Sequence, residues 1–430
     1  MTRTWFGGIV AGPQKEKAHR HRGPRAVEAR HAFGGFVWRP VTGLVLFVWW
    51  LACGLTAAAL AYLLLALAAV LAFKPEPAPG WGGKSPAMTL LKPLCGLEDG
   101  LEQALESFLS QEVASPVRFV FGVSDSADPA LALARRVASR HPGRDVHFVA
   151  DPAVHGPNPK VSNLINMASG GLAPIVAISD SDIVLAPGDL QRAIDSLSPP
   201  DLGAVTALYR GRPGLAGDRI RDFGAWFLDY WFLPMAVLHA RLAPLAVTYG
   251  PLTLIRREVL EKTGGLPALA SHLSDDAVLG QQVRSAGYRV GFMPVMAETL
   301  ANDASHAELF DHELRWARTV RGLDPLGYVA SVVSHAGPLP LLLLLFPGWL
   351  AFAGIAAPVL LRWLLVLAVS RKFGRADTLP MPGPIGIWLR DCYCFAVWAA
   401  GFAVGRVGWR GQRLQVERRD VLRSAGEQAQ

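Results

Sequence analysis

The sequence predicts an α/β protein in which a mostly parallel sheet is sandwiched by helices, with transmembrane helices at both ends. Two observations predict this architecture. Short apolar runs alternate with helix-like segments at the spacing of parallel crossover connections. Long, almost uncharged stretches lie on either side of this alternating block.

The composition of this 430-residue chain indicates a membrane protein, because 51% of its residues are hydrophobic and only 18% are charged. Residues 41–73 contain no charged side chain and predict a retained transmembrane anchor. Residues 337–370 predict a transmembrane segment, and residues 385–407 a transmembrane or re-entrant one. Residues 86–335 have ordinary polarity and are long enough for one globular domain.

The net charge of +7 comes mainly from the two ends of the chain. Residues 1–40 form a basic, polar segment that we expect to be disordered, and residues 408–430 form a basic tail. Because these segments flank apolar spans, they suit anionic lipid headgroups better than nucleic acid. The four cysteines have neither zinc nor disulfide spacing and are read as structural thiols. No standard signal peptide is expected, because residues 1–40 precede the first apolar run.

The orientation of the anchor has two readings. Arginines before it favour an N-terminus in the cytoplasm, and they are Arg20, Arg22, Arg25, Arg30 and Arg39. One crossing would then place the globular domain outside, away from nucleotides. Either the segment re-enters or the charge rule is overridden. At about 1.5 Å per residue the anchor is roughly 50 Å long, more than the ~30 Å hydrocarbon core, so it must tilt, emerge or bend.

The first half of the globular block alternates strands and helices. Strands are expected at residues 88–96 (ending in a loop), 117–123, 146–150 and 175–179. Helices are expected where Leu101, Leu105, Phe108 and Leu109 share one face, from an Asp128 cap through Pro129 to Arg140, and over residues 160–168.

Two carboxylates, Asp180 and Asp182, follow the β-branched run at residues 175–178. Such a run suits a strand buried on both faces, and ligands bind beyond the carboxyl ends of these strands. Paired carboxylates there commonly hold a divalent cation, which in turn bridges phosphate groups. The alternative is that Ser-Asp-Ser-Asp is a polar turn that caps a helix.

The second half is less regular. Residues 219–241 predict a helix crowded with aromatic side chains, either lying in the membrane interface, which we favour, or buried in the protein. Residues 247–255 form a strand-like run broken by Gly250-Pro251. Ser274-Asp-Asp opens a helix that reaches about Ser285, and Ser305-His-Ala-Glu is a capping box before another helix.

The chain resembles the ceramide glucosyltransferase-like family of membrane glycosyltransferases, which are inverting enzymes with the GT-A fold. The resemblance covers roughly residues 88–334 and the flanking spans, and its strength lies in the order and spacing of six short motifs. These are LLKPLCG (90–96), VSDSADPA (123–130), NPKVSNLINM (158–167), SDSDI (179–183), SDD (274–276) and HELRW (312–316). Tyr209-Arg-Gly-Arg-Pro213 and residues 312–318 look most similar to the bacterial hopanoid-biosynthesis members.

The resemblance implies roles for residues that bind the nucleotide sugar. Asp125 would contact the uracil or ribose of a UDP-sugar, and Lys160 would help to bind the nucleotide. Lys92 and Pro93, in the first motif, would belong to the same site. Asp180 and Asp182 would hold the sugar nucleotide through Mg²⁺ or Mn²⁺, and which of the two touches the metal stays open.

The resemblance also implies a catalytic set. Inversion needs a base to take the proton of the acceptor hydroxyl, and Asp276 is our choice, with Asp275 in reserve; the alternative for both is capping of the helix that follows. Arg315 would bind the leaving diphosphate, because guanidinium matches phosphate oxygens in bidentate fashion. Trp316 could line the acceptor pocket. His312 stands where the family usually has Gln or Arg, and we read it as an ordinary helix-face histidine.

The implied activity is transfer of one sugar, glucose or N-acetylglucosamine, from a UDP-sugar to the hydroxyl of a membrane lipid, a hopanoid or a ceramide. The expected location is the bacterial inner membrane, with the catalytic domain facing the cytoplasm and no nucleic-acid partner. Two alternatives stay open: a processive polysaccharide synthase of the same superfamily and a non-catalytic lipid-binding protein. The sequence leaves the sugar, the acceptor, the metal and the oligomeric state undecided.

Overall fold

The computed structural model describes residues 35–212, 218–346, 348–374, 379–403, 406–409, 412–416 and 422–424. The chain divides into two units, Met1–Leu51 and Ala52–Gln430, and the contacts discussed below all lie within the second. The predictions for residues 1–34, including the disorder of the N-terminal segment, fall outside the described residues, as do most of those for the C-terminal tail.

Eight strands form one mixed sheet in the order β3-β2-β1-β4-β7-β6-β8-β5. Neighbours from β3 to β4 are parallel, β6 and β8 are parallel, and β7 and β5 run antiparallel to their neighbours. The mostly parallel sheet is therefore confirmed. The strands are β1 (Met88–Pro93), β2 (Val117–Val123), β3 (Asp145–Ala150), β4 (Ile175–Ile178), β5 (Ile183–Val184), β6 (Leu202–Arg212), β7 (Thr253–Arg256) and β8 (Arg289–Leu300).

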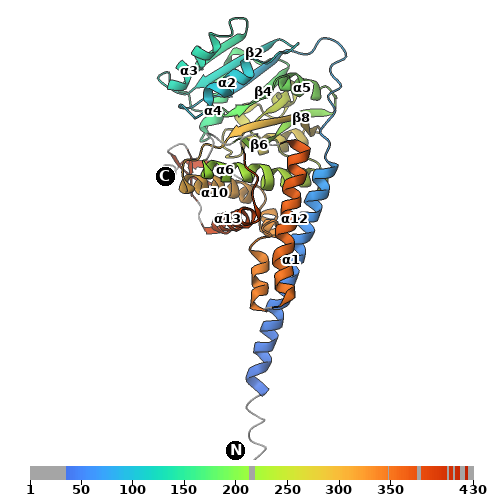
Figure 1. The fold of residues 1–430 in the computed structure, drawn as a ribbon. Helices are drawn as coiled ribbons and strands as arrows, with labels where there is room; N and C mark the ends of the chain where they lie inside the picture. Colours follow the sequence, from blue (N-terminus) through green and yellow to red (C-terminus); the bar gives the residue numbers. More distant parts are fainter. Residues whose placement is uncertain are drawn as a thin grey trace, which may run out of the picture. The chain divides into compact units, whose positions relative to one another are not determined.

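The helices that connect the first strands form where the apolar periodicity and the caps predict them. Asp128 accepts a hydrogen bond from Ala130 N and caps α3, and Asn158 caps α4 through Val161 N. Figure 1 shows the helices and the sheet. The helices around the sheet are α2 (Leu101–Leu109), α3 (Pro129–Ala138), α4 (Pro159–Met167), α5 (Asp189–Ser196), α8 (Arg257–Lys262) and α9 (Asp275–Ser285).

The two longest strands, β6 and β8, have no counterpart among the predicted elements. In β8 the reason is local, because Pro294 cannot donate a ladder hydrogen bond and argues against a strand. The ladder accommodates it with a register shift, since Thr206 pairs with Phe292 and Leu208 with Met296. The predicted strand at 247–255 shrinks to β7, because Gly250-Pro251 forms a turn before it.

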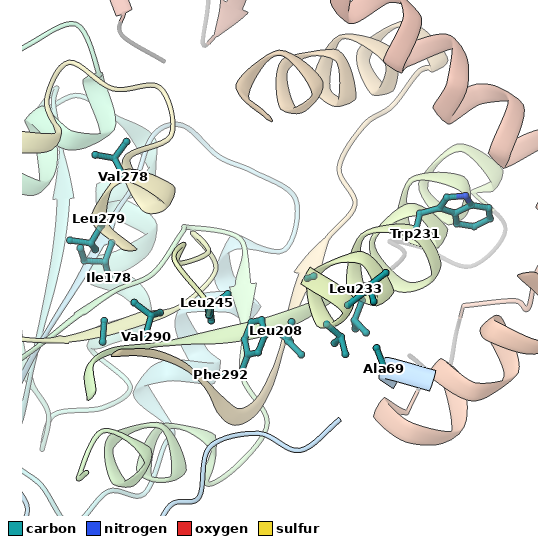
Figure 2. Close-up of a cluster of buried hydrophobic side chains, with 14 of the residues drawn as sticks. Ala69, Ile178, Leu208, Trp231, Leu233, Leu245, Val278, Leu279, Val290 and Phe292 are labelled. Carbon is teal, nitrogen blue, oxygen red and sulfur yellow. The ribbon is translucent and has the colours of Figure 1, made fainter. Parts of the chain in front are cut away.

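The aromatic segment is a helix, as predicted, in three parts: α6 (Arg219–Phe227), a π-helical stretch (Leu228–Phe232) and α7 (Leu233–Leu242). Tyr230 and Trp231 are buried, and Phe223, Trp226 and Phe227 are half-buried. This packing favours the buried-helix alternative over the interfacial position that the sequence suggested. The π-helical stretch packs on β6 and α12, and Figure 2 shows Trp231 and Leu233 in the apolar cluster that also contains Leu208 and Phe292.

Two helices of the described chain are long and apolar enough to cross a membrane: residues 43–72 of α1 (Gly35–Ala72) and α12 (Trp349–Phe373). Residues 325–345 form a bent pair that could add a third span. The helices of this half that follow the sheet are α10 (His306–Leu323), α11 (Pro325–Ala330) and α13 (Pro384–Ala403). Helix α13 has 20 residues but is not among the described helices that are apolar enough to span a membrane, so its predicted membrane role stays a prediction.

Charged side chains are buried where α13 packs on α10 and α12. Arg390 is 0% exposed and donates to Glu313 Oε1, while its guanidinium lies over the rings of Phe223, Phe227 and Tyr393. Arg362 of α12 pairs with Asp391 at 3.1 Å. These pairs join α13 to the protein interior.

Candidate active site

The carboxyl ends of β1, β2 and β4 meet at one edge of the sheet, because these strands are parallel neighbours. Asp125 follows β2, is exposed, and accepts a hydrogen bond from Ala127 N at 2.9 Å. Asp180 follows β4. With about 4.8 Å between neighbouring strands, the ends of β2 and β4 lie roughly 10 Å apart. Asp125 and Asp180 therefore follow strand ends that are far enough apart for the two carboxylates to contact different parts of one extended ligand.

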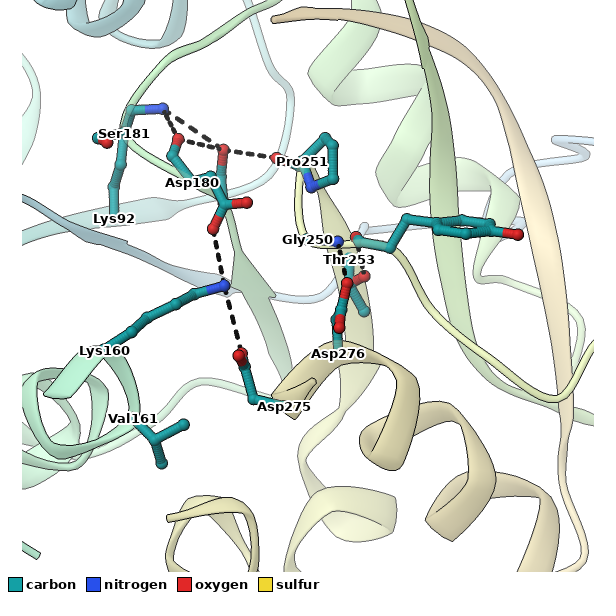
Figure 3. A network of polar contacts seen from close by, with 12 residues as sticks. Lys92, Lys160, Val161, Asp180, Ser181, Gly250, Pro251, Thr253, Asp275 and Asp276 are labelled. Atoms are coloured by element: carbon teal, nitrogen blue, oxygen red, sulfur yellow. Dashed lines mark hydrogen bonds and ion pairs between the residues drawn. The ribbon is translucent and has the colours of Figure 1, made fainter. Parts of the chain in front are cut away.

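Lys160 joins this edge to a helix from a distant part of the sequence. Its Nζ lies 2.7 Å from Asp180 Oδ1 and 3.2 Å from Asp275 Oδ2, and Figure 3 shows the amine between the two carboxylates. Only 15% of the lysine side chain is exposed. Burial lowers the pKa of Lys160, but Asp180, Asp275 and Asp276 outweigh it and raise the pKa above its ordinary value. The amine is therefore a permanent cation.

Asp276 is held by backbone donors. Its Oδ2 accepts from Gly250 N and its Oδ1 from Ala277 N, both at 2.8 Å, and its carbonyl oxygen accepts from Thr248 Oγ1 at 2.6 Å. Burial and the charge of Asp275 raise the pKa of the Asp276 carboxyl to about 7, although Lys160 acts to lower it. The group is thus oriented and poised to exchange a proton near neutral pH.

Gly250 packs between the carboxylates of Asp180 and Asp276. A Cβ at this position would lie 2.5 Å from Asp180 Oδ2, so only glycine fits without displacing that side chain. The same residue donates its N–H to Asp276. Ser179 Oγ donates to Pro251 O at 2.8 Å, which fixes the turn against the end of β4. This turn therefore sets the relative positions of the two carboxylates.

Lys92 and Pro93 do not offer side chains to a ligand, contrary to their expected place in the nucleotide-sugar site. Both are buried, and Lys92 is 0% exposed. Its Nζ donates to Asp180 O at 2.6 Å and to Ile183 O at 3.4 Å, and it lies 4.2 Å from the centre of the Phe108 ring. Burial lowers the pKa of Lys92 to about 7 despite the nearby carboxylates. Its role is to hold the backbone of the Asp180 loop.

Asp182 lies two residues after Asp180 in the same loop. Its Oδ2 accepts a hydrogen bond from Thr299 Oγ1 of β8, and burial and the charge of Asp180 raise its pKa. Within the described residues no group of three or more His, Cys, Asp or Glu could hold a metal ion. Two carboxylates fit a cation that also takes phosphate oxygens and water as ligands, as Mg²⁺ does, and do not fit an all-protein cage. A bound cation would relieve the repulsion between Asp180 and Asp182, which adds to burial in raising the pKa of Asp182.

Arg315 and Trp316 lie on α10, which packs on α6 and α13. Both are half-buried, and Trp316 stacks on Phe227 with ring centres 5.8 Å apart. His312 contacts Trp316, and its Nδ1 lies 3.2 Å from Asp303 Oδ2, so the ring has a structural partner. The Ser305 half of the predicted capping box is present, with Ser305 Oγ accepting from Glu308 N, whereas the Glu308 carboxylate accepts from Ala304 N. The roles of Arg315 at a diphosphate and of Trp316 at an acceptor stay predictions.

Two residues of this site were not found from the sequence. Thr299 and Gly250 come from β8 and from the turn before β7, far in sequence from the carboxylates that they contact. Thr299 carries no local signal of its role. The break at Gly250-Pro251 was visible in the sequence, but only the packed structure shows that it lies against Asp180.

Most of the chain is similar in sequence to known glycosyltransferases. A sequence profile described as glycosyl transferase family 21 matches residues 51–422. Two proteins of Caenorhabditis elegans, ceramide glucosyltransferase 1 and ceramide glucosyltransferase 3, are 27% identical over 242 residues and 22% identical over 240 residues. Each match covers 54% of this chain and, respectively, 49% and 50% of the relative, so the chain spans about half the length of these curated relatives.

A solved structure has a similar fold. It is the mannosyltransferase PcManGT from Pyrobaculum calidifontis in complex with GDP-Man and Mn²⁺, and it matches with a TM-score of 0.52. The match covers 83% of this chain and 99% of that one, at 18% identity. The likeness confirms the expected GT-A fold, and the donor and metal named for that protein are properties of that protein.

Proposed function

Since the chain belongs to glycosyl transferase family 21, we propose that it is a membrane-bound inverting glycosyltransferase. It moves a single sugar, glucose or N-acetylglucosamine, from a UDP-sugar to the hydroxyl of a membrane lipid. The relatives named ceramide glucosyltransferase support a lipid acceptor. A ceramide or a hopanoid is the acceptor that we propose, and the hopanoid rests on the sequence motifs alone.

One observation carries this proposal: the bridge that Lys160 makes between Asp180 and Asp275. Asp180 follows β4 at the edge where sheets of this kind bind ligands. Asp275 begins α9, whose second residue is Asp276. The bridge therefore connects two parts of the proposed site. One is the end of the sheet, where we propose that the donor binds, and the other is α9, which carries the proposed base.

Asp276 is the general base of the proposed reaction. One of its carboxylate oxygens takes the proton of the lipid hydroxyl while the hydroxyl oxygen forms a bond to the anomeric carbon of the sugar. The bond between that carbon and the diphosphate oxygen breaks on the opposite face, so UDP leaves and the configuration inverts. A pKa of about 7 suits this role, because about half of the carboxyl groups are ionised at neutral pH and each is more basic than an ordinary carboxylate.

The donor is bound at the neighbouring strand ends. In this proposal Asp125 contacts the uridine, and Lys160, whose Nζ lies 2.7 Å from Asp180 Oδ1, orients Asp180 for binding the diphosphate. Arg315 is the second cation proposed for the leaving group, because its fork of donors matches phosphate oxygens. A divalent cation held by Asp180 and Asp182 would neutralise charge on the leaving diphosphate when it is bound.

A lipid acceptor agrees with the membrane helices of the chain. Residues 43–72 and α12 are each long and apolar enough to span a bilayer. Both flank the sheet in the sequence, so they would tether the domain to the bilayer that contains a lipid acceptor. We propose that the protein lies in a bacterial inner membrane with the sheet facing the cytoplasm, where UDP-sugars are made.

The test uses the purified full chain in detergent, with Mg²⁺ or Mn²⁺. UDP-glucose, UDP-N-acetylglucosamine and UDP-galactose are each offered with ceramide and with a hydroxylated hopanoid. We expect a lipid heavier by one sugar, with the anomeric configuration opposite to that of the donor by NMR. Chelation of the metal by EDTA should abolish transfer, and added Mn²⁺ or Mg²⁺ should restore it.

The other outcomes separate the alternatives. A polymeric product would replace the proposal with a processive synthase, which needs enough spans to build a channel. Failure to bind any UDP-sugar would indicate a non-catalytic lipid-binding protein. Lipid analysis of a deletion strain then identifies the acceptor in the cell, by showing which glycolipid disappears.

A further inference from the structure

A pocket of about 450 Å³ lies where α1 ends, apart from the carboxylates described above. Its apolar wall includes Ala72 and Phe73 at the end of α1, Ala240 of α7, Leu245 and Phe292 of β8. Pockets of this volume are typical of small-molecule sites, and this one combines apolar and polar lining residues. The wall can therefore accept the hydrocarbon part of a ligand.

The rim of this pocket is basic. Lys74, Arg241 and Arg284 line it, and within the described residues none of the three has a carboxylate within ion-pair distance. The fourth cation, Arg289, is already paired, because it contacts Glu76 at 3.0 Å and Asp201 at 2.5 Å. Three uncompensated cations around one opening favour an anion, and a neutral sugar-accepting hydroxyl would not need them.

The pocket lies next to the C-terminal ends of the two candidate membrane-spanning helices. Residues 43–72 form the first span, and Phe73, in the pocket wall, follows it directly. Phe373 is the last residue of α12, and its ring centre lies 5.4 Å from that of Phe73. Arg371 and Lys372 occupy the last turn of α12 and are exposed. Both spans therefore end beside a group of basic side chains, as at the surface of an anionic leaflet.

We propose that this pocket binds an anionic glycerophospholipid. Its phosphate lies among Lys74, Arg241 and Arg284, and the start of an acyl chain lies along Ala72 and Phe73. The site is distinct from the proposed active site, since none of its lining residues is among those proposed to bind the donor or the acceptor or to act as the base. It would fix the depth of the sheet relative to the bilayer surface, and it does not depend on which sugar or acceptor the protein uses.

The test measures lipid binding directly. The purified full chain in detergent is titrated with dioleoyl-phosphatidylglycerol or dioleoyl-phosphatidylcholine, and bound lipid is counted by native mass spectrometry. We expect clear preference for phosphatidylglycerol. Two cations near a lipid surface are worth roughly a 30-fold change in affinity, so Arg241→Gln/Arg284→Gln should weaken binding of phosphatidylglycerol by about that factor.

Two further variants make the test specific. Ala240→Trp fills the pocket without changing the charge and should also weaken binding. Arg136→Gln/Arg192→Gln removes the same charge from α3 and α5, which do not line the pocket, and should bind as the wild type does. UDP binding should be unchanged in all of these variants.

Three results would overturn the proposal. The first is equal affinity for the two lipids. The second is unchanged phosphatidylglycerol binding in the Arg241→Gln/Arg284→Gln variant. The third is displacement of the lipid by inorganic phosphate at the lipid's own concentration, which would assign the pocket to a free phosphate ligand.

Discussion

Replacing Lys160 with methionine removes the cation that two carboxylates share, while keeping an unbranched side chain of similar length. Asp180 and Asp275 are then left close to each other without a counter-charge. We expect the folded state to lose stability. We also expect the pKa of Asp276 to rise, because Lys160 acts to lower it.

The magnitude follows from the two distances. At an effective dielectric constant of about 20, contacts of 2.7 and 3.2 Å correspond to about 6 and about 5 kcal/mol of attraction before desolvation is subtracted. Breaking a buried pair costs about 3–5 kcal/mol net. Because 35% of the Asp180 side chain is exposed and can be rehydrated, we take the lower end, about 3 kcal/mol. For a domain of this size that is a fall of roughly 6–12 °C in Tm.

The assay is thermal unfolding of the purified protein in detergent. Lys262→Met is the matched control, because Lys262 is exposed, donates a long hydrogen bond to Ala286 O at 3.5 Å, and has its amine 5.3 Å from the centre of the Tyr288 ring. The control should melt close to the wild type. Lys160→Met/Asp275→Asn should regain part of the loss, since it removes one uncompensated carboxylate. If Lys160→Met melts within about 2 °C of the wild type, which is less than 1 kcal/mol, the bridge is not the link that we describe.

Three further predictions test other contacts of the structure. Asp276 must be ionised to accept a proton, so wild-type activity should fall as the pH drops through about 7. Asp275→Asn removes a charge that raises the pKa of Asp276, so the fall in activity should move to lower pH. An unmoved pH–rate profile would contradict this coupling between the two carboxyl groups. Gly250→Ala places a Cβ 2.5 Å from Asp180 Oδ2 and should lower the free energy of unfolding by about 1–3 kcal/mol, measured by thermal unfolding. The control Gly83→Ala places its Cβ where no atom lies within 4 Å, and it should melt like the wild type. Arg390→Met leaves the buried carboxylate of Glu313 unpaired and should lower the free energy of unfolding by about 3–5 kcal/mol. Most of this stability should return when Glu313 is also neutralised. An unchanged Tm would show that the pair contributes nothing.

Local signals predicted the first half of the sheet and its helices well. The apolar run before Asp180 forms a strand buried at every position, and Asp128 caps α3 as its sequence indicates. These features depend on a few neighbouring residues, which is why the sequence alone could identify them. The ordered set of short motifs predicted the family, because motif order survives where overall identity is low.

The sequence was less informative wherever a residue acts through a distant partner. Nothing near Lys92 indicates that its amine is buried against the backbone of the Asp180 loop, and its motif alone predicts a place in the ligand site. Pro294 concealed β8, and with it Thr299, which contacts Asp182. Strand register and the packing of loops are set by contacts across the whole domain, and one-dimensional patterns do not contain them.

The central claim is that Asp276 takes the proton of the acceptor hydroxyl. Its most direct test is transfer by Asp276→Asn in a single turnover, with the UDP-sugar and lipid that the wild type uses. General-base catalysis contributes about 10²–10⁴-fold, so we predict a fall in rate of that size, with UDP binding retained. Transfer at the wild-type rate would contradict the claim and remove Asp276 from the mechanism.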